Sequence, residues 1–168
     1  MQPSVTYRLV DEESPLWHDD MHWLTDAYCQ AIGEELTYSQ TILARSVDLT
    51  KKQDVYQMMV GLNPRLDQTC LFIAMTADVR IGYFLGMIKP CLAEIPDRIG
   101  YINGVYVLPE WRGRGIGQSL LNEGMKWFRR QGLKGVELYA VNHNERAKKF
   151  WRKNGYQSVE EVMICSIK

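Results

Sequence analysis

The stretch Tyr101–Leu121, YINGVYVLPEWRGRGIGQSLL, joins an apolar run with strand character to an amphipathic helical run through a glycine-rich turn. Gly113, Gly115 and Gly117 carry no Cβ, so the backbone there can adopt positive φ angles and turn several N–H groups toward one anion. The helix predicted to begin at Ile116 places the positive end of its dipole at the same point. These features predict a phosphate-binding turn.

Two arginines within the turn strengthen this prediction. Arg112 and Arg114 are forked, permanently charged donors that suit pyrophosphate oxygens. The turn is not a dinucleotide fingerprint, because Gln118 or Leu120 stands where the last glycine of G-x-G-x-x-G is required. It is not a P-loop either, because the Gly-Lys-Ser/Thr element is absent.

Arg112, Gly115 and Gly117 resemble the R/Q-x-x-G-x-G/A acyl-CoA signature of the GNAT N-acetyltransferase superfamily. The resemblance continues in the run 144–156, NERAKKFWRKNGY, which is similar to the family's second helix with its N-x-x-A motif and terminal Gly-aromatic pair. It covers about the C-terminal half of the chain, from about Cys70 onward. It implies acetyl-CoA as co-substrate, bound by Val105, Val107, Arg112, Gly113, Arg114, Gly115, Ile116, Gly117 and Asn144.

The 168 residues suit one domain, 1–168, which the resemblance identifies as an acyl-CoA N-acyltransferase domain. The pattern predicts an α/β (α+β) fold: a mixed, largely antiparallel sheet of about six to seven strands flanked by about four helices. Strands are expected at Val5–Val10, Leu71–Met75, Ile81–Ile88, Gly100–Val107, Val136–Val141 and after Tyr156. Helices are expected from Ser14 to Ile32, at 37–48 and 50–59, from Ile116 to Gly132, and from Asn144 to Asn154. Gly104, inside a strand, predicts a β-bulge that widens the slot for the pantetheine arm.

The net charge of zero is unevenly distributed along the chain. Residues 1–100 contain 8 Lys/Arg and 14 Asp/Glu, a net −6, and residues 101–168 contain 12 and 6, a net +6. The basic half carries the phosphate turn, and the acidic half suits a cationic amine entering past residues such as Asp19, Asp20, Asp26, Glu34, Glu35, Glu94 and Asp97. A net charge of zero argues against nucleic acid as a partner.

The remaining composition indicates a cytoplasmic protein without a metal. Neither a membrane span nor a signal peptide is predicted. Cys29, Cys70, Cys91 and Cys165 lack C-x-x-C spacing, so buried thiols are expected rather than disulfides or zinc ligands. His18 and His22 stand one helical turn apart like the histidines of H-E-x-x-H, but Asp replaces the Glu and no third ligand is apparent.

Acyl transfer from a thioester to an amine requires a neutral amine, a polarised carbonyl and a proton for the thiolate. By the period-two rule Tyr101, Asn103, Val105 and Val107 share one face of the central strand. The candidate catalytic residues are Asn103, which could hold a water, and Tyr101 and Tyr106 as proton donors. Tyr139 is a further possible proton donor, and Glu94 and Asp97 are alternative bases.

The resemblance departs from the family at two catalytic positions. Aminoglycoside-modifying members, which the chain resembles around 72–75 and 104–115, place an acidic residue where Asn103 stands. Many members have a tyrosine where Trp151 stands, and here core packing is the favoured interpretation of that residue. The leading function is therefore N-acetyl transfer directly to the primary amine of a small cationic molecule. A non-catalytic acyl-CoA sensor, or an acetyltransferase of peptide or protein amines, is the alternative, and a homodimer is left open.

Overall fold

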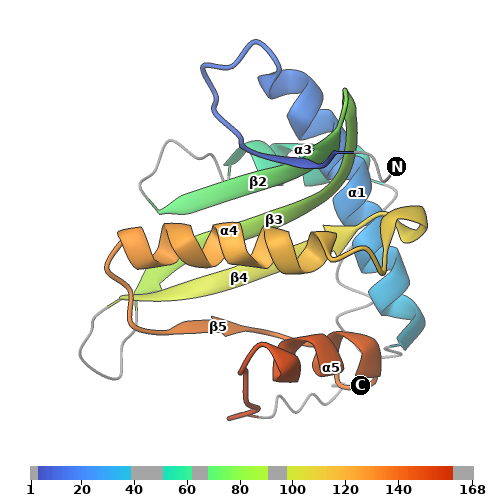
Figure 1. Ribbon diagram of the computed structural model, residues 1–168. Coiled ribbons are helices and arrows are strands. Elements are labelled where there is room, and N and C mark those ends of the chain that lie inside the picture. Colours follow the sequence, from blue (N-terminus) through green and yellow to red (C-terminus); the bar gives the residue numbers. More distant parts are fainter. Residues whose placement is uncertain (1–3, 39–50, 62–67, 91–97, 161–168) are drawn as a thin grey trace, which may run out of the picture.

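The structure, a computed structural model, describes residues 4–38, 51–61, 68–90 and 98–160. A five-stranded sheet in the order β1-β2-β3-β4-β5 forms its centre (Figure 1). The strands are β1 (Thr6–Leu9), β2 (Thr69–Thr76), β3 (Val79–Pro90), β4 (Arg98–Val107) and β5 (Val136–Leu138). Neighbours from β1 to β4 are antiparallel, and β4 and β5 are parallel. The parallel pair needs a crossover connection, which the helix between its strands provides.

Helices cover both faces of the sheet. They are α1 (Trp17–Tyr38), α3 (Lys52–Gly61), α4 (Ile116–Arg130) and α5 (Glu145–Lys153), with a short 3-10 helix η1 (Pro109–Trp111) before α4. In Figure 1, α4 crosses in front of the sheet, and α1 and α3 lie behind it. Within the described ranges no helix is long and apolar enough to cross a membrane.

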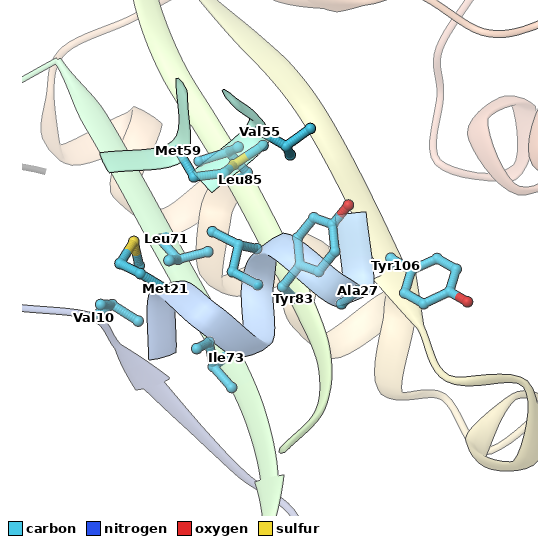
Figure 2. Close-up of a cluster of buried hydrophobic side chains, with 11 residues drawn as sticks. Val10, Met21, Ala27, Val55, Met59, Leu71, Ile73, Tyr83, Leu85 and Tyr106 are labelled. Carbon is cyan, nitrogen blue, oxygen red and sulfur yellow. The ribbon is translucent and has the colours of Figure 1, made fainter. Parts of the chain in front are cut away.

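The face toward α1 and α3 carries one hydrophobic cluster. Met21 and Leu24 of α1 are buried here as part of the predicted helical stripe. Figure 2 shows the buried side chains of α1, α3 and the strands packed together, with Tyr83 and Tyr106 pointing their hydroxyls in different directions. His22, of the histidine pair noted above, stacks on Tyr56 of α3 with ring centroids 4.5 Å apart.

The opposite cluster holds α4 against β3. Phe84 is fully buried, and its ring meets that of Phe128 edge to face at 6.1 Å. A Cβ on Gly124 would lie 2.1 Å from Phe84 Cζ, so α4 can approach this closely only because that position is glycine. The close approach fixes the helix whose first turn forms the predicted phosphate site.

The sequence placed most elements correctly. The expected strands at 71–75 and 81–88 and the strand that ends at Val107 are present, each slightly longer than predicted, and β5 is shorter. The sheet has five strands in the described part rather than six to seven. Most of the helix expected at 37–48 and of the chain after Tyr156 lies outside the described residues.

A buried ion-pair network fastens α1 to the sheet. Asp20 is fully buried, and its Oδ1 accepts hydrogen bonds from Arg8 of β1 and Arg80 of β3, both at 2.8 Å. Burying a carboxylate is tolerable here because both partners are cationic. The sequence analysis expected Asp20 near the substrate entrance, and this expectation is wrong because its charge is used inside the fold.

We expect Asp20→Ala to lower the free energy of unfolding by about 3–5 kcal/mol, because it leaves two partly buried guanidinium groups without their anion. Urea denaturation followed by circular dichroism would measure this. Asp26→Ala is the matched control on the same helix, since the Asp26–Lys52 pair lies in solvent and should contribute nothing measurable. Equal stabilities of the two variants would contradict the assignment.

Candidate functional site

The candidate site begins at an irregularity in β4. The β3–β4 register pairs Leu85 with Gly104 and Gly86 with Ile102, so Asn103 has no partner. This is the predicted bulge, and Asn103 is the extra residue beside Gly104. The Oδ1 atom of Asn103 is buried and has no hydrogen-bond partner within the described residues. A buried acceptor without a partner is unusual in a folded protein and marks a place where a ligand group or water can bind.

Beyond the bulge, β4 separates from β5. The two strands pair only from Gly100 to Ile102, so the following residues of β4 have an open edge. Leu108 N donates to Ile81 O of the β3 side at 3.0 Å. Because main-chain groups alternate in direction along an antiparallel strand, the N–H and C=O groups of Val105 and Val107 point away from β3, toward this opening. The groups of Val105 and the N–H of Val107 are therefore available to a ligand lying along β4, whereas Val107 O accepts a hydrogen bond from Arg112 Nε at 2.8 Å.

The bulge also corrects an expectation from the sequence. Tyr101, Asn103, Val105 and Val107 do not share one face as the period-two rule predicted. Val105 and Val107 pack with the α4 cluster together with Ile102, whereas Tyr101 lies within electrostatic reach of Tyr28 and Glu35 on α1. One extra residue reverses the alternation of side chains beyond it.

The predicted phosphate turn follows η1. Gly113 and Gly115 adopt φ angles of 77° and 80°, and Gly115 caps the N-terminus of α4. In the described structure the N–H groups of the five residues Gly113 to Gly117 donate no hydrogen bond. Five free amides at the positive end of a helix form an anion-binding cradle.

The two arginines of the turn differ in their surroundings. Arg114 stacks over Trp111, with 4.6 Å from its Cζ to the ring centroid, and donates to Glu110 O. No carboxylate neutralises it in the described part of the chain. Arg112 turns instead toward α1, where its Nη2 donates to both oxygens of Glu34 at 2.9 and 2.8 Å.

The far side of the opening is formed by α5. Asn144 is buried and caps this helix as predicted, with Oδ1 accepting from Ala147 N at 3.0 Å. Its Nδ2 has no described partner and remains a free donor. Trp151 packs edge to face against Phe150 and Tyr156 at 5.0 and 5.2 Å. Core packing therefore accounts for Trp151, as the sequence analysis favoured.

Three tyrosines, Tyr28 of α1, Tyr83 of β3 and Tyr101 of β4, lie within electrostatic reach of the carboxylate of Glu35. Burial raises the pKa values of Tyr28, Tyr83 and Tyr101, and the charge of nearby Glu35 raises them further. Glu35 is exposed and can exchange its proton with solvent, yet desolvation by the surrounding protein raises the pKa of its carboxyl. The sequence analysis placed Glu35 among the acidic residues that a cationic amine would pass, but it did not single Glu35 out as a base, because no motif marks it.

Tyr106, the other tyrosine predicted to be catalytic, is engaged elsewhere. The hydroxyl of Tyr106 donates to Glu34 Oε1 at 2.7 Å. Burial and this hydrogen bond raise the pKa of Tyr106 well above its usual range. Tyr101 therefore lies within electrostatic reach of Glu35, while the hydroxyl of Tyr106 donates to a different carboxylate.

The acidic residues expected at the substrate entrance separate into different environments. Asp26 pairs with Lys52 at 2.5 Å and Glu34 with Arg112, leaving Asp19 and Glu35 without described partners. Glu94 and Asp97 lie outside the described residues. A depression of about 310 Å³ lies elsewhere, between β1 and the outer side of α4, and includes none of the cradle amides.

The sequence is similar to those of known acetyltransferases. The model of the acetyltransferase (GNAT) family matches residues 46–156. An uncharacterized N-acetyltransferase of Methanocaldococcus jannaschii is 33% identical over 64 residues, covering 38% of this chain and 28% of that protein. A mycothiol acetyltransferase of Geodermatophilus obscurus is 28% identical over 93 residues, covering 55% and 30%. This chain thus matches less than a third of the length of either relative.

Solved structures support the fold. A predicted acetyltransferase of Clostridium acetobutylicum, crystallised with acetyl-CoA, matches with a TM-score of 0.75 at 16% identity, over 97% of this chain and 96% of that one. The structure of AAC(6')-Iy with a bisubstrate analogue matches with a TM-score of 0.67 at 18% identity, over 98% and 99%.

We expect Gly115→Ala to destabilise the protein by about 1–2 kcal/mol, because a side chain at φ 80° is strained. Urea denaturation measures the loss. Gly117→Ala is the control, two residues further along the chain. Gly117 lies inside the helix, and a Cβ there would make an ordinary 3.7 Å contact with Val107. It should leave stability unchanged or raise it by up to about 1 kcal/mol. Equal losses in both variants would show that the positive φ is not what requires glycine.

Proposed function

Because the chain belongs to the acetyltransferase (GNAT) family, we propose that it transfers an acetyl group from acetyl-CoA directly to the primary amine of a small cationic molecule. One observation carries this proposal. The five free amides at the N-terminus of α4 continue into the open edge of β4 at Val105 and Val107. A pyrophosphate joined to a polar, amide-containing arm matches that succession of donors.

The cofactor would be held mainly by the backbone. The amides of Gly113 to Gly117 would bind the pyrophosphate, and Arg114 would add a charge-assisted contact. Main-chain groups of Val105 and Val107 would pair with the pantetheine arm as a neighbouring strand would. The free Nδ2 of Asn144 would donate to a carbonyl of the arm from the α5 side. Arg112 would contribute through the shape of the turn, since its Nε donates to Val107 O at 2.8 Å.

The amine must lose a proton before it can attack. An alkylamine with a pKa near 10.4 is neutral in only about one molecule in a thousand at pH 7. A base in the site therefore lowers the activation free energy of acyl transfer by removing the proton. Glu35 suits this task because its raised pKa makes it a better proton acceptor than an ordinary glutamate. The unpartnered Oδ1 of Asn103 would accept a hydrogen bond from the amine or from a relay water.

The leaving thiolate needs a proton in return. We assign this role to Tyr101, which has no carboxylate partner in the described structure, rather than to Tyr106, whose hydroxyl donates to Glu34. An acetyl-cysteine intermediate is not required. Burial raises the pKa values of the Cys29 and Cys70 thiols, so neither is an activated thiolate. Cys91 and Cys165 lie outside the described residues.

The acceptor is inferred from the same group of side chains. The carboxylate of Glu35, which is exposed and within electrostatic reach of Tyr28 and Tyr101, would attract an alkylammonium ion through its charge. Aminoglycoside N(6')-acetyltransferase of Salmonella typhimurium, 25% identical over 58% of this chain and 69% of that protein, is named for an acceptor of this class. This supports a small cationic amine over a folded protein.

An amine screen monitored by release of free CoA thiol tests the function. The panel contains spermidine, neamine, L-phenylalanine methyl ester and a lysine-containing peptide. We expect a small cationic amine to be the best acceptor and its KM to rise with ionic strength, because the attraction is electrostatic. CoA binding in calorimetry without thiol release above background would instead identify a non-catalytic sensor. A preference for the peptide, or for an uncharged acceptor, would contradict the acceptor assignment.

We expect Glu35→Gln to lower kcat/KM by about 10²-fold or more, because glutamine has the same shape but cannot accept a proton. In the wild type, activity should fall as pH decreases through the raised pKa of Glu35, since only the carboxylate acts as a base. The pH profile of the variant should lack this decrease at low pH. Steady-state kinetics from pH 5 to 9 would measure both effects. Asp19→Asn, an exposed change on the same helix, should leave kcat/KM unaltered, so a similar loss there would refute the role of Glu35.

A further inference from the structure

The carboxylate of Glu34 joins three parts of the molecule that are distant in sequence. It accepts two hydrogen bonds from Arg112 of the phosphate turn and one from Tyr106 of β4. Arg146 of α5 lies 3.7 Å from its Oε2. In Figure 1 the last turns of α1 correspondingly lie between the turn that precedes α4 and the start of α5.

The guanidinium of Arg112 uses its Nε and Nη2 groups in this arrangement. Its Nη2 bonds to Glu34, its Nε donates to Val107 O at 2.8 Å, and its Cζ lies 5.1 Å from the centre of the Tyr106 ring. Burial alone would raise the pKa of Glu34, but the hydrogen bonds from Arg112 and Tyr106 and the positive charges of Arg112 and Arg146 lower it overall. Glu34 is therefore ionised at neutral pH and neutralises Arg112 continuously.

We propose that Arg112 is a positioning residue that acts through Glu34 to hold the end of α1 over β4, and that it is not a direct ligand of the cofactor phosphates. Binding a phosphate through Nε or Nη2 would require those groups to leave Val107 O or the Glu34 carboxylate. Arg114, which has no carboxylate partner in the described structure, is the phosphate ligand of the turn. The inference rests on the proposed function for what the site binds, but the Arg112–Glu34 contact itself does not depend on it.

The contact has a consequence for the acceptor side. Glu35 follows Glu34 directly in α1, and successive helical residues are rigidly related by the backbone. Fixing Glu34 against the turn therefore fixes the backbone that carries Glu35 beside Tyr101. Loss of the contact should impair use of the amine while the amide cradle, at Gly113 to Gly117, still binds CoA.

The test compares Arg112→Ala, Glu34→Ala and their double variant with Arg114→Ala. Calorimetry with CoA gives Kd, and hydrogen exchange of residues 28–36 without ligand gives the order of α1. We expect the three variants of the contact to behave alike: Kd for CoA within about threefold of wild type, and exchange in 28–36 faster by about tenfold, with no additional effect in the double variant. Arg114→Ala should raise Kd by about tenfold and leave the exchange of α1 unaltered.

Kinetics separate positioning from a general loss of structure. With spermidine or neamine, whichever is the better acceptor, the contact variants should raise the amine KM by about tenfold and leave the KM for acetyl-CoA nearly unchanged. Arg112→Lys and Glu34→Gln, less disruptive changes, should show the same pattern, because lysine lacks the second donor that binds Val107 O and glutamine lacks the charge that pairs with Arg112.

A tenfold loss of CoA affinity in Arg112→Ala, or tighter CoA binding in Glu34→Ala, would overturn the inference, because either would make Arg112 a phosphate ligand for which Glu34 competes. Unchanged exchange of residues 28–36 in the contact variants would overturn it as well. If neither amine is acetylated and the wild type does not bind CoA, the proposed function fails, while the exchange measurement still decides whether the contact orders α1.

Discussion

The single extra residue at Asn103 determines how the rest of the site is arranged. A strand paired on both sides has no free main-chain groups to offer a ligand, and β4 is paired on both sides only up to Ile102. From the bulge onward its edge toward β5 is open, and Val105 and the N–H of Val107 present main-chain groups that no described strand pairs with. The bulge thus converts part of a structural strand into a binding strand while the β3 side remains paired and keeps it rigid.

The amide cradle depends on that rigid support in turn. A helix N-terminus binds an anion well only when its direction is fixed, because the free amides must converge on one point. The direction of α4 is set by close contact with β3, which Gly124 permits by leaving room for the ring of Phe84. Gly113 and Gly115 then supply the backbone angles that let the chain leave β4 and enter the helix within a few residues.

In the proposed function two oppositely charged ligands would meet across β4. The cradle and Arg114 form a positive site on the side of α4, and Glu35 with its neighbouring tyrosines forms a negative, aromatic site on the side of α1. Most of the other acidic side chains of α1 are neutralised by the protein itself, Asp20 by two partly buried arginines and Glu34 by Arg112. The charge difference between the two parts of the sequence therefore does not measure the charge that a ligand would meet.

Local pattern determined the fold and the cofactor side of this protein. The period of apolar residues, the cap at Asn144 and the glycine spacing of the turn act over a few neighbouring residues, so the sequence alone predicted β3, β4, α4, α5 and the bulge beside Gly104. Tertiary structure decided the rest. The side chains of β4 change faces at the bulge because Asn103 is an extra residue in the strand. The sequence analysis predicted a bulge near Gly104 but applied the period-two rule across it. Arg112 pairs with Glu34, which is 78 residues away in sequence, and Asp20 pairs with Arg8 and Arg80. These pairs form because the fold brings side chains of opposite charge together. The role of each charged residue was therefore decided by its neighbours in space, which no spacing in the sequence encodes.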